Sequence, residues 1–317
     1  MRPSRRPIII ATRKSRLALA QSQAVANALA KLNPNIGVRL LPMDTRGDQM
    51  LSHPLAGSGG KGLFTRALES ALLREKADMA VHSLKDMPTD STNGLVIAAV
   101  PKRGDVRDCL IAHTAESIDA LPPNATIGTA SRRRAAQLAQ QRPDLRFETL
   151  RGNIETRIQR VKQDKQFDAT LLAVAGLQRG GLGEHANHPI PTDVMLPAAG
   201  QAALAIQCRA GDHVTLRRCL PLNDSLTAAC VEAERSVIAK LAGDCTSPLA
   251  VLAEPVEGGK IRIRARALSP DGSQCIEADD VGTLRQLRHT ADRVIKYLIA
   301  HGAPQIIRPA GEVKRVS

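Results

Sequence analysis

The sequence predicts an α/β protein, with two domains of alternating strands and helices followed by a small α+β domain at the C-terminus. Short apolar runs alternate with amphipathic stretches of helical period from residue 8 to about residue 196. After about residue 225 the pattern changes to closely spaced strands and hairpin turns. The chain has 317 residues, which is too long for one small core. Two or three domains are therefore expected.

The first domain is expected to cover residues 1–101. Leucine and valine at helical spacing predict its helices at Arg16–Lys31 and Gly62–Lys76. Apolar runs predict its strands at Ile8–Ala11, Val38–Met43, Asp78–Ser83 and Leu95–Val100. Such alternation argues for a parallel sheet with right-handed crossovers.

The second domain, residues 106–197, repeats this scheme after a hinge expected at Pro101–Gly104. Its strands are expected near Cys109–Ala112, Thr126–Gly128, Arg146–Leu150 and Ala169–Ala175. In the third domain, residues 225–317, a helix at Ser225–Leu241 precedes short strands and a helix at Leu284–Ala300 closes the chain. Ile261–Arg266 alternates apolar residues with arginines, as a half-buried strand does, so the three arginines are expected to form a solvated face.

The charge balance indicates an anionic partner. Lys and Arg number 44 against 31 acidic residues, a formal charge of +13. Nucleic acid is disfavoured because the chain has no Trp, one Tyr and three Phe, so aromatic platforms for bases are nearly absent. No apolar run approaches the roughly 20 residues needed to span a bilayer, and the stretch after Met1–Arg6 is too short for a signal peptide. We therefore expect a cytoplasmic protein that binds a small polyanion, with no nucleic acid and no membrane as partner.

The most informative segment is Val81–Pro88. An apolar run from Ala77 to Val81 ends in Lys85, Asp86 and Pro88. In an α/β protein a buried strand delivers polar side chains to a ligand crevice at such a point. One acid beside one base there can hold an anionic substrate and move protons. The alternative is a surface Lys–Asp pair in an ordinary turn.

Other strand-to-helix junctions carry arginine, with a hydroxyl or a glycine beside it. Helix N-termini offer free N–H groups and the positive end of the dipole, and arginine adds a planar fork for carboxylates. Junctions that converge on one crevice would form a receptor for a ligand with many carboxylates. They are Arg13–Ser15, Gly128–Arg134, Leu150–Asn153 with Arg157, and Arg179.

These motifs, in this order, resemble the porphobilinogen deaminase (hydroxymethylbilane synthase) family. The resemblance runs from about Ile8 to the loop of Cys245. It implies two periplasmic-binding-protein-like βα domains with a hinge, plus a small C-terminal α+β domain. It also implies that Ala202–Ile206 returns to the first sheet, so that residues about 202–221 join the first domain. The matching motifs are Arg13–Ser15, Gly59–Phe64, Val81–Pro88, Gly128–Arg134, Leu150–Asn153 and Leu172–Gly176.

The resemblance implies an enzyme of tetrapyrrole (haem) biosynthesis that condenses four porphobilinogen molecules head to tail into hydroxymethylbilane, with release of ammonia. It assigns catalysis to Asp86 with Lys85 beside it. A dipyrromethane cofactor is implied on Cys245 through a thioether, with no metal, and the protein is implied to be a monomer. Phe64 is expected to pack against a pyrrole ring or to belong to the core. The implied carboxylate-binding residues are Arg13, Ser15, Lys85, Thr129, Ser131, Arg133, Arg134, Arg151, Arg157 and Arg179.

Several positions depart from the family pattern. Asp244 precedes the anchor cysteine, and Ala202 and Gln207 stand where the family usually has glycine and glutamate. Arg132 is an extra charge with no assigned role. The long aperiodic loop at 47–60 is expected to form a flexible lid.

Two other classes of protein remain open at this point. A two-domain receptor for small anions would show the same crossover topology, but it gives no reason for Asp86 beside Lys85 or for the Cys245 loop. A nucleic-acid binder predicts salt-dependent retention on DNA without pyrrole chemistry.

Overall fold

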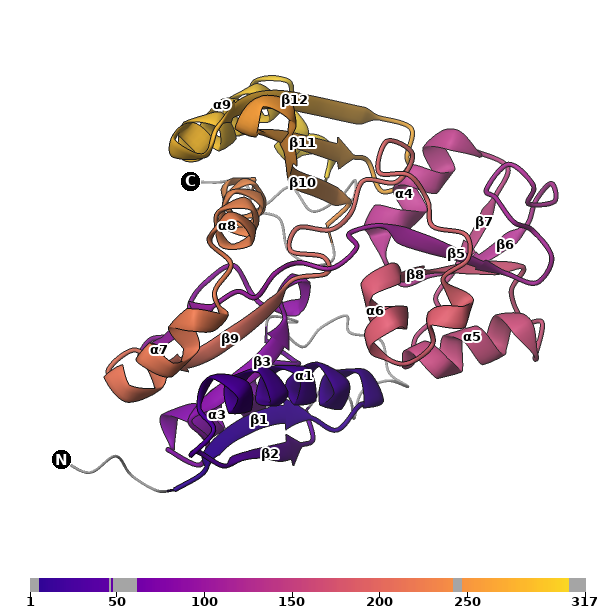
Figure 1. The fold of residues 1–317 in the computed structure, drawn as a ribbon. Helices are drawn as coiled ribbons and strands as arrows, with labels where there is room; N and C mark the ends of the chain where they lie inside the picture. The colour runs from indigo at the N-terminus through magenta and orange to yellow at the C-terminus, as the bar shows by residue number, and fades with distance from the viewer. Residues whose placement is uncertain (1–5, 46, 48–61, 242–246, 308–317) are drawn as a thin grey trace, which may run out of the picture. The chain divides into compact units, whose positions relative to one another are not determined.

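The computed structural model describes residues 6–45, 47, 62–241 and 247–307. The chain divides into two compact units, and Figure 1 traces the order of their elements by colour. The first unit is 1–104, 179–181 and 202–228, and the second is 105–178, 182–201 and 229–317. The expected lid, apart from Gly47, and the expected anchor Cys245 lie outside the described residues. The three-domain division stays a prediction.

The first unit is built on a five-stranded sheet in the order β2-β1-β3-β9-β4. Residues of α1 such as Leu29 pack on one face with Ile10, while Leu68 of α3 packs on the other with Ala11. Alternate residues of β1 therefore serve two cores, as a strand buried on both faces requires. The strands are β1 (Ile8–Arg13), β2 (Val38–Met43), β3 (Met79–Ser83), β4 (Leu95–Ala99) and β9 (Leu204–Arg209); the helices are α1 (Arg16–Leu32), α3 (Arg66–Leu73) and α7 (His213–Cys219).

The second unit contains a four-stranded sheet in the order β5-β8-β6-β7. It is also covered on both faces, by Leu138 of α4 on one and by Ile158 of α5 on the other. Its strands are β5 (Asp108–Ala112), β6 (Thr126–Gly128), β7 (Arg146–Glu148) and β8 (Ala169–Ala173); its helices are α4 (Arg132–Gln141), α5 (Ile154–Lys162) and α6 (Val174–Arg179), the last residue of which falls in the first unit.

A three-stranded antiparallel sheet completes the second unit. Its core joins Val237 of α8 to Ile263 of β11 and Leu298 of α9. The elements are β10 (Leu249–Val256), β11 (Lys260–Leu268), β12 (Cys275–Thr283), α8 (Ser225–Lys240), α9 (Leu287–Ala300) and α10 (Ala303–Ile306). The first four residues of α8 fall in the first unit.

The hairpin between β11 and β12 reaches helix α4. Gly272 in its turn has φ +76°, and a Cβ added there would lie 2.5 Å from the carbonyl oxygen of Ala136 and 2.9 Å from the amide nitrogen of Gln140. Only glycine fits this contact, because both the backbone angle and the space exclude a side chain. The C-terminal sheet thus packs directly against the four-stranded sheet's helix layer.

The expectation of parallel sheets is wrong for three strand pairs. β3 and β4 both pair antiparallel with β9, and β5 pairs antiparallel with β8. A strand buried on both faces reads as a continuous apolar run whichever way it points, so the sequence pattern does not contain its direction. The place of β9 between β3 and β4 is the return to the first sheet that the resemblance implied for Ala202–Ile206.

The expectation of a solvated arginine face on β11 is wrong for two of its three arginines. Arg264 donates to Glu254 at 2.5 Å and to Thr192 at 2.7 Å. Arg266 lies 2.9 Å from a carboxylate oxygen of Glu277. Both side chains turn toward a neighbouring strand or toward residues 192–194. The alternation of apolar residues and arginines predicts only that the arginines share a face of β11, not that this face is solvated.

Candidate active site

Strand β3 delivers Lys85 and Asp86 to one end of the first sheet. Its residues Met79–His82 are buried, and a single 3-10 turn, Leu84–Asp86, follows the strand. Leu84 is buried and its amide donates to the carbonyl of Ala203 at 3.0 Å, which holds the turn against the segment before β9. Lys85 is half-buried and Asp86 is exposed. The turn therefore presents an acid and a base to the solvent side of the sheet end.

The end of β1 carries a second polar group. Ser15 caps helix α1, and its hydroxyl oxygen accepts a hydrogen bond from the amide of Ala18 at 3.3 Å. The guanidinium carbon of Arg13 lies 4.3 Å from the centre of the Phe64 ring, a cation–π distance. Phe64 thus supports Arg13, and its packing against a pyrrole ring stays a prediction.

Arg179 belongs to the first unit although it ends helix α6. Its Nη2 donates to the carbonyl of Ala202 at 2.7 Å, and burial lowers the pKa of its guanidinium. Ala202 has φ +69°, in the left-handed region that favours glycine. This backbone conformation gives a physical reason for the glycine that the family usually has at that position.

A buried polar group lies behind Asp86 in the first unit. His82 on β3 lies 3.0 Å, Nε2 to Oε1, from Gln207 on β9. The amide nitrogen of Gln207 donates to Glu69 of α3 at 3.1 Å, and the Thr65 hydroxyl donates to the other oxygen of Glu69 at 3.5 Å. We call these four residues, Thr65, Glu69, His82 and Gln207, the buried polar chain. The sequence pattern does not predict this chain, because His82 and Gln207 stand inside apolar strands.

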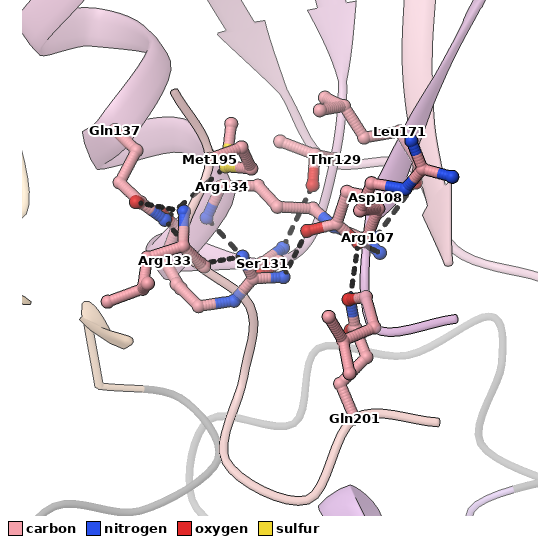
Figure 2. A network of polar contacts seen from close by, with 12 residues as sticks. Arg107, Asp108, Thr129, Ser131, Arg133, Arg134, Gln137, Leu171, Met195 and Gln201 are labelled. Carbon is pink, nitrogen blue, oxygen red and sulfur yellow. Dashed lines mark hydrogen bonds and ion pairs between the residues drawn. The ribbon is translucent and has the colours of Figure 1, made fainter. Parts of the chain in front are cut away.

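In the second unit, the N-terminus of α4 forms the main candidate site (Figure 2). The Ser131 hydroxyl oxygen accepts from the amide of Arg134 at 3.4 Å, and the Thr129 hydroxyl oxygen accepts from the amide of Ser131 at 3.1 Å. Each hydroxyl keeps its own proton to donate. The helix start is therefore capped and still has donors for an anion.

Arg133 and Arg134 turn inward and pair with one buried carboxylate, that of Asp108 on β5 (Figure 2). The nitrogen–oxygen distances are 2.8 Å for Arg133 and 2.6 Å for Arg134. Asp108 is 0% exposed, and the two arginines are 5% and 7% exposed. The other Nη of each arginine donates to a backbone carbonyl at 2.8 Å, that of Leu196 for Arg133 and that of Leu171 for Arg134.

This cluster contains two guanidinium groups and one carboxylate. Gln201 also donates to Asp108, at 3.0 Å. Burial lowers the pKa of Arg133, against the opposing attraction of Asp108. Within the described residues, Nε of Arg134 is buried and has no hydrogen-bond partner. The sequence pattern predicted these arginines at the ligand surface and did not indicate Asp108, which begins the apolar run of β5.

The start of α5 resembles the start of α4. The Asn153 side chain accepts from the amide of Thr156 at 2.8 Å and so caps the helix. Arg157 donates from Nε to the carbonyl of Gly152 at 2.9 Å, and Arg151 is half-buried beside it. Arg132, an extra charge with no role predicted from the sequence, is exposed.

The structure thus groups the predicted residues by unit. Arg13, Ser15, Phe64, Lys85, Asp86 and Arg179 belong to the first, and Thr129, Ser131, Arg133, Arg134, Arg151 and Arg157 belong to the second. Among the described residues, no three His, Cys, Asp or Glu side chains form a group suited to a metal ion. In the same part of the chain, no helix has both the length and the apolar composition needed to cross a membrane.

Strand ends that carry an acid, a base, arginines and capped helix starts define a two-unit α/β protein suited to a small ligand rich in carboxylates. Residues 8–217 match the family model described as "Porphobilinogen deaminase, dipyromethane cofactor binding domain". Residues 228–294 match the model "Porphobilinogen deaminase, C-terminal domain". The chain belongs to the porphobilinogen deaminase family.

Individual relatives agree with this assignment. Porphobilinogen deaminases of Legionella pneumophila strains Lens and Philadelphia 1 are 45% and 44% identical to this chain over 300 residues, which is 95% of this chain and 97% of theirs. Among solved structures, the periplasmic aliphatic sulphonate binding protein SsuA from Escherichia coli is 13% identical and covers 75% of this chain and 70% of its own, with a TM-score of 0.39. Because that TM-score is below 0.5, this likeness adds no support for the fold.

The chain is therefore an enzyme that condenses porphobilinogen with loss of ammonia into a linear tetrapyrrole. Its domain at 8–217 is of the kind that binds a dipyrromethane cofactor. The residues present suit that group, since its acetate and propionate side chains need cationic and hydroxyl donors. The unpartnered Nε of Arg134 and the hydroxyls at the start of α4 are donors of this type.

Proposed function

We propose that Asp86 is the catalytic residue of this condensation and that Lys85 assists it. The supporting observation is the position of Asp86, exposed and beside Lys85 on the one turn that follows β3. Loss of ammonia requires a proton on the leaving amine, and it leaves a cationic methylene-pyrrole. A carboxylic acid gives that proton, and the resulting carboxylate stabilises the cation and the pyrrole N–H groups.

The same proposal gives the remaining site residues the task of binding carboxylates. Arginine suits this task because it stays ionised and binds a carboxylate in a planar fork. The position of these residues at strand ends and helix starts supports the assignment. Arg133 and Arg134 are the buried members of the set, because Asp108 holds their side chains beneath the start of α4. The proposed set is Arg13, Ser15, Lys85, Thr129, Ser131, Arg133, Arg134, Arg151, Arg157 and Arg179.

We further propose that the dipyrromethane cofactor is attached through the thiol of Cys245. The proposal rests on the family resemblance. When bound, the cofactor supplies the primer to which porphobilinogen units are added. Attachment exchanges the thiol proton and the substrate amine for a thioether and ammonia, so that no oxidant, reductant or metal is required.

Intact mass measurement tests the anchor. Wild-type protein should carry an excess mass of two linked pyrrole units, and Cys245→Ala should carry none. If neither protein carries the excess, porphobilinogen is added and both are weighed again. Slow gain by the wild type alone supports the anchor, and no gain by the wild type would contradict attachment through Cys245.

Replacement of the acid tests the catalytic assignment. We expect Asp86→Asn to lose about 100-fold or more of its turnover, as loss of a general acid does. Its thermal unfolding should stay unchanged, because Asp86 is exposed. Asp90→Asn, which removes an exposed carboxylate from the same segment, is the matched control and should retain turnover. Wild-type turnover in Asp86→Asn would rule out the assignment.

The proposal also includes a cytoplasmic monomer that works without nucleic acid or membrane. Sedimentation equilibrium of the holoenzyme measures the mass of the particle, and a mass of two chains would contradict the monomer. Retention on a DNA column that persists at physiological salt would contradict the expectation that the enzyme has no nucleic-acid partner.

A further inference from the structure

Gln137 on α4 makes a set of hydrogen bonds to which the function proposed above gives no role (Figure 2). It lies one turn after Arg133 on the same face of the helix and is 0% exposed. Its amide nitrogen donates to the carbonyl of Leu196 at 3.0 Å, and its carbonyl oxygen accepts from the backbone amide of Leu196 at 2.9 Å. The same nitrogen lies 3.3 Å from the carbonyl oxygen of Arg133 and 3.3 Å from the sulfur of Met195. Gln137 thus pairs with both polar groups of one backbone residue.

The backbone of Leu196 fixes which way the Gln137 amide points. An N–H group only donates and a carbonyl oxygen only accepts, so the opposite orientation would bring donor against donor and acceptor against acceptor. Leu196 is buried and lies outside the helices and strands, where no ladder pairs its backbone. A buried N–H or C=O without a partner costs free energy, so Gln137 specifies the path of the chain at Leu196.

The carbonyl of Leu196 is also a partner of Arg133. Nη1 of Arg133 donates to this oxygen at 2.8 Å, and Nη2 donates to Asp108 at 2.8 Å. Among the contacts of the described residues, these two use two of the five N–H donors of the guanidinium, so it keeps donors for a ligand carboxylate. One backbone oxygen accepts from both side chains. A displacement of Leu196 would therefore turn the guanidinium about the nitrogen that Asp108 holds.

Arg266 holds Gln137 from the C-terminal sheet. Arg266 lies on β11, and its Nη1 donates to the side-chain oxygen of Gln137 at 3.3 Å and to the carbonyl of Val194 at 3.3 Å. Its Nη2 donates to the carbonyl of Asp193 at 2.7 Å, and its Nε lies 2.9 Å from Glu277 on β12. The guanidinium therefore ties both α4 and this segment of the chain to the C-terminal sheet.

We propose that Gln137 is a positioning residue for the binding of ligand carboxylates. It holds the carbonyl of Leu196 in the place that orients the guanidinium of Arg133, and Arg266 holds Gln137 from the C-terminal sheet. Arg133 binds the carboxylate, and Gln137 acts on it through Leu196. The carboxylates are those of the dipyrromethane cofactor and of porphobilinogen. This inference rests on the proposed role of Arg133.

The first test measures cofactor assembly in the full-length protein prepared without the cofactor. Gln137→Met has a side chain of similar length that cannot pair with both groups of Leu196. With porphobilinogen as the probe, intact mass followed over time should show assembly about 10-fold slower than in the wild type, well below the unfolding midpoints of both. Gln141→Met is the matched control. Gln141 is exposed and ties α4 to the carbonyl of Val194 at 2.7 Å, and its loss should leave assembly unchanged.

The second test measures the loaded enzymes. Gln137→Met should raise the KM for porphobilinogen about 10-fold and change kcat by less than about 2-fold, because the binding of a carboxylate is weakened while Asp86 is untouched. A merely structural role would instead lower kcat and the unfolding midpoint together and leave KM as in the wild type, and this result would contradict the proposal.

A double-mutant cycle shows whether Gln137 acts through Arg133. Arg133→Lys keeps a positive charge beside Asp108 and loses the fork that also reaches Leu196. It should slow assembly by itself, and Gln137→Met added to it should slow assembly by less than about 2-fold more. Full additivity of the two changes would overturn the proposal. Assembly in Gln137→Met as fast as in Gln141→Met would overturn it as well.

If Gln137→Met does not fold, Arg266→Met takes its place, because it keeps the pairing of Gln137 with Leu196 and removes only the restraint from β11. It should slow assembly about 3-fold. Arg262→Met is its control, since Arg262 lies on the same strand and pairs with Asp279. Equal rates in these two variants would refute the inference. Wild-type assembly in Arg133→Lys would instead refute the proposed role of Arg133, which separates the two failures.

Discussion

Replacement of Asp108 by asparagine should destabilise the second unit strongly, although the two side chains have nearly the same volume. Asp108 is fully buried, and its two oxygens accept from Arg133 at 2.8 Å and from Arg134 at 2.6 Å. Asparagine removes the only carboxylate that faces these guanidinium groups in the described cluster. It also turns an NH₂ donor toward an arginine donor.

The size of the effect follows from burial. Removal of one partner from a buried ion pair costs about 3–5 kcal/mol, because the other charge stays buried without compensation. A domain of this size loses about 2–4 °C of Tm for each kcal/mol, so the unfolding midpoint should fall by about 6–20 °C. The bonds from the arginines to Leu196 and Leu171 remain and limit the loss.

Differential scanning calorimetry or urea unfolding followed by circular dichroism measures this loss. Asp279→Asn is the matched control, since it breaks the pair with Arg262, whose side chain is 40% exposed. An exposed pair contributes about 1 kcal/mol or less, and salt weakens it. The loss in Asp108→Asn should persist at high salt. If Asp108→Asn costs no more than Asp279→Asn, the carboxylate does not hold the two arginines and the reasoning fails.

Two further outcomes are expected. Gly272→Ala should destabilise the second unit by about 2 kcal/mol or more, because its Cβ would lie 2.5 Å from a backbone oxygen of α4. Gly258→Ala is the matched control: Gly258 has φ +73° and nothing within 4 Å of its added Cβ, so this variant should cost about 1 kcal/mol. Equal unfolding midpoints for the two variants would show that the α4 contact does not matter. The first unit should lose stability as pH falls from about 6.5 toward 4, since burial lowers the pKa of His82 to about 4 and the unfolded chain therefore binds the proton first. The loss approaches about 3 kcal/mol. Urea unfolding at several pH values measures the free energy of unfolding of the wild type and of His82→Gln. If this free energy depends on pH equally in the two proteins, the prediction is contradicted.

The sequence predicted the strands well where apolar runs end in glycine or are followed by a polar residue. Thr126–Gly128 and Val38–Met43 have the expected bounds. The helix expected at Gly62–Lys76 is shorter, Arg66–Leu73, since Gly62 has φ +78°, which no α-helix contains. The directions of β5 and β9 were not predictable, because an apolar run does not record them.

The site was predicted less evenly. Asp86 and Ser15 lie where a strand end and a helix start place them. The inward turn of Arg134 was missed, although it stands four residues before the buried Leu138 and so on the same face of α4. Asp108 and His82 escaped notice because a single polar residue in an apolar strand shows its role only when its partners, distant in the chain, are known.

The fit of Gly272 against α4 bears on how this enzyme can be dissected. Three features belong to the same unit: the hairpin turn at Gly272, the ion pair between Arg264 and the carboxylate of Asp193, and the core around α9. A fragment that begins at α8 lacks α4, so it would expose the hairpin turn at Gly272. It would also lack Thr192 and Asp193, two of the acceptors of Arg264. Residues 105–201 expressed alone would expose the surface of α4 against which Gly272 packs, and Asp193 would lose its ion pair with Arg264. Neither fragment is therefore a promising autonomous module, and co-expression of the two should be needed to recover a stable fold.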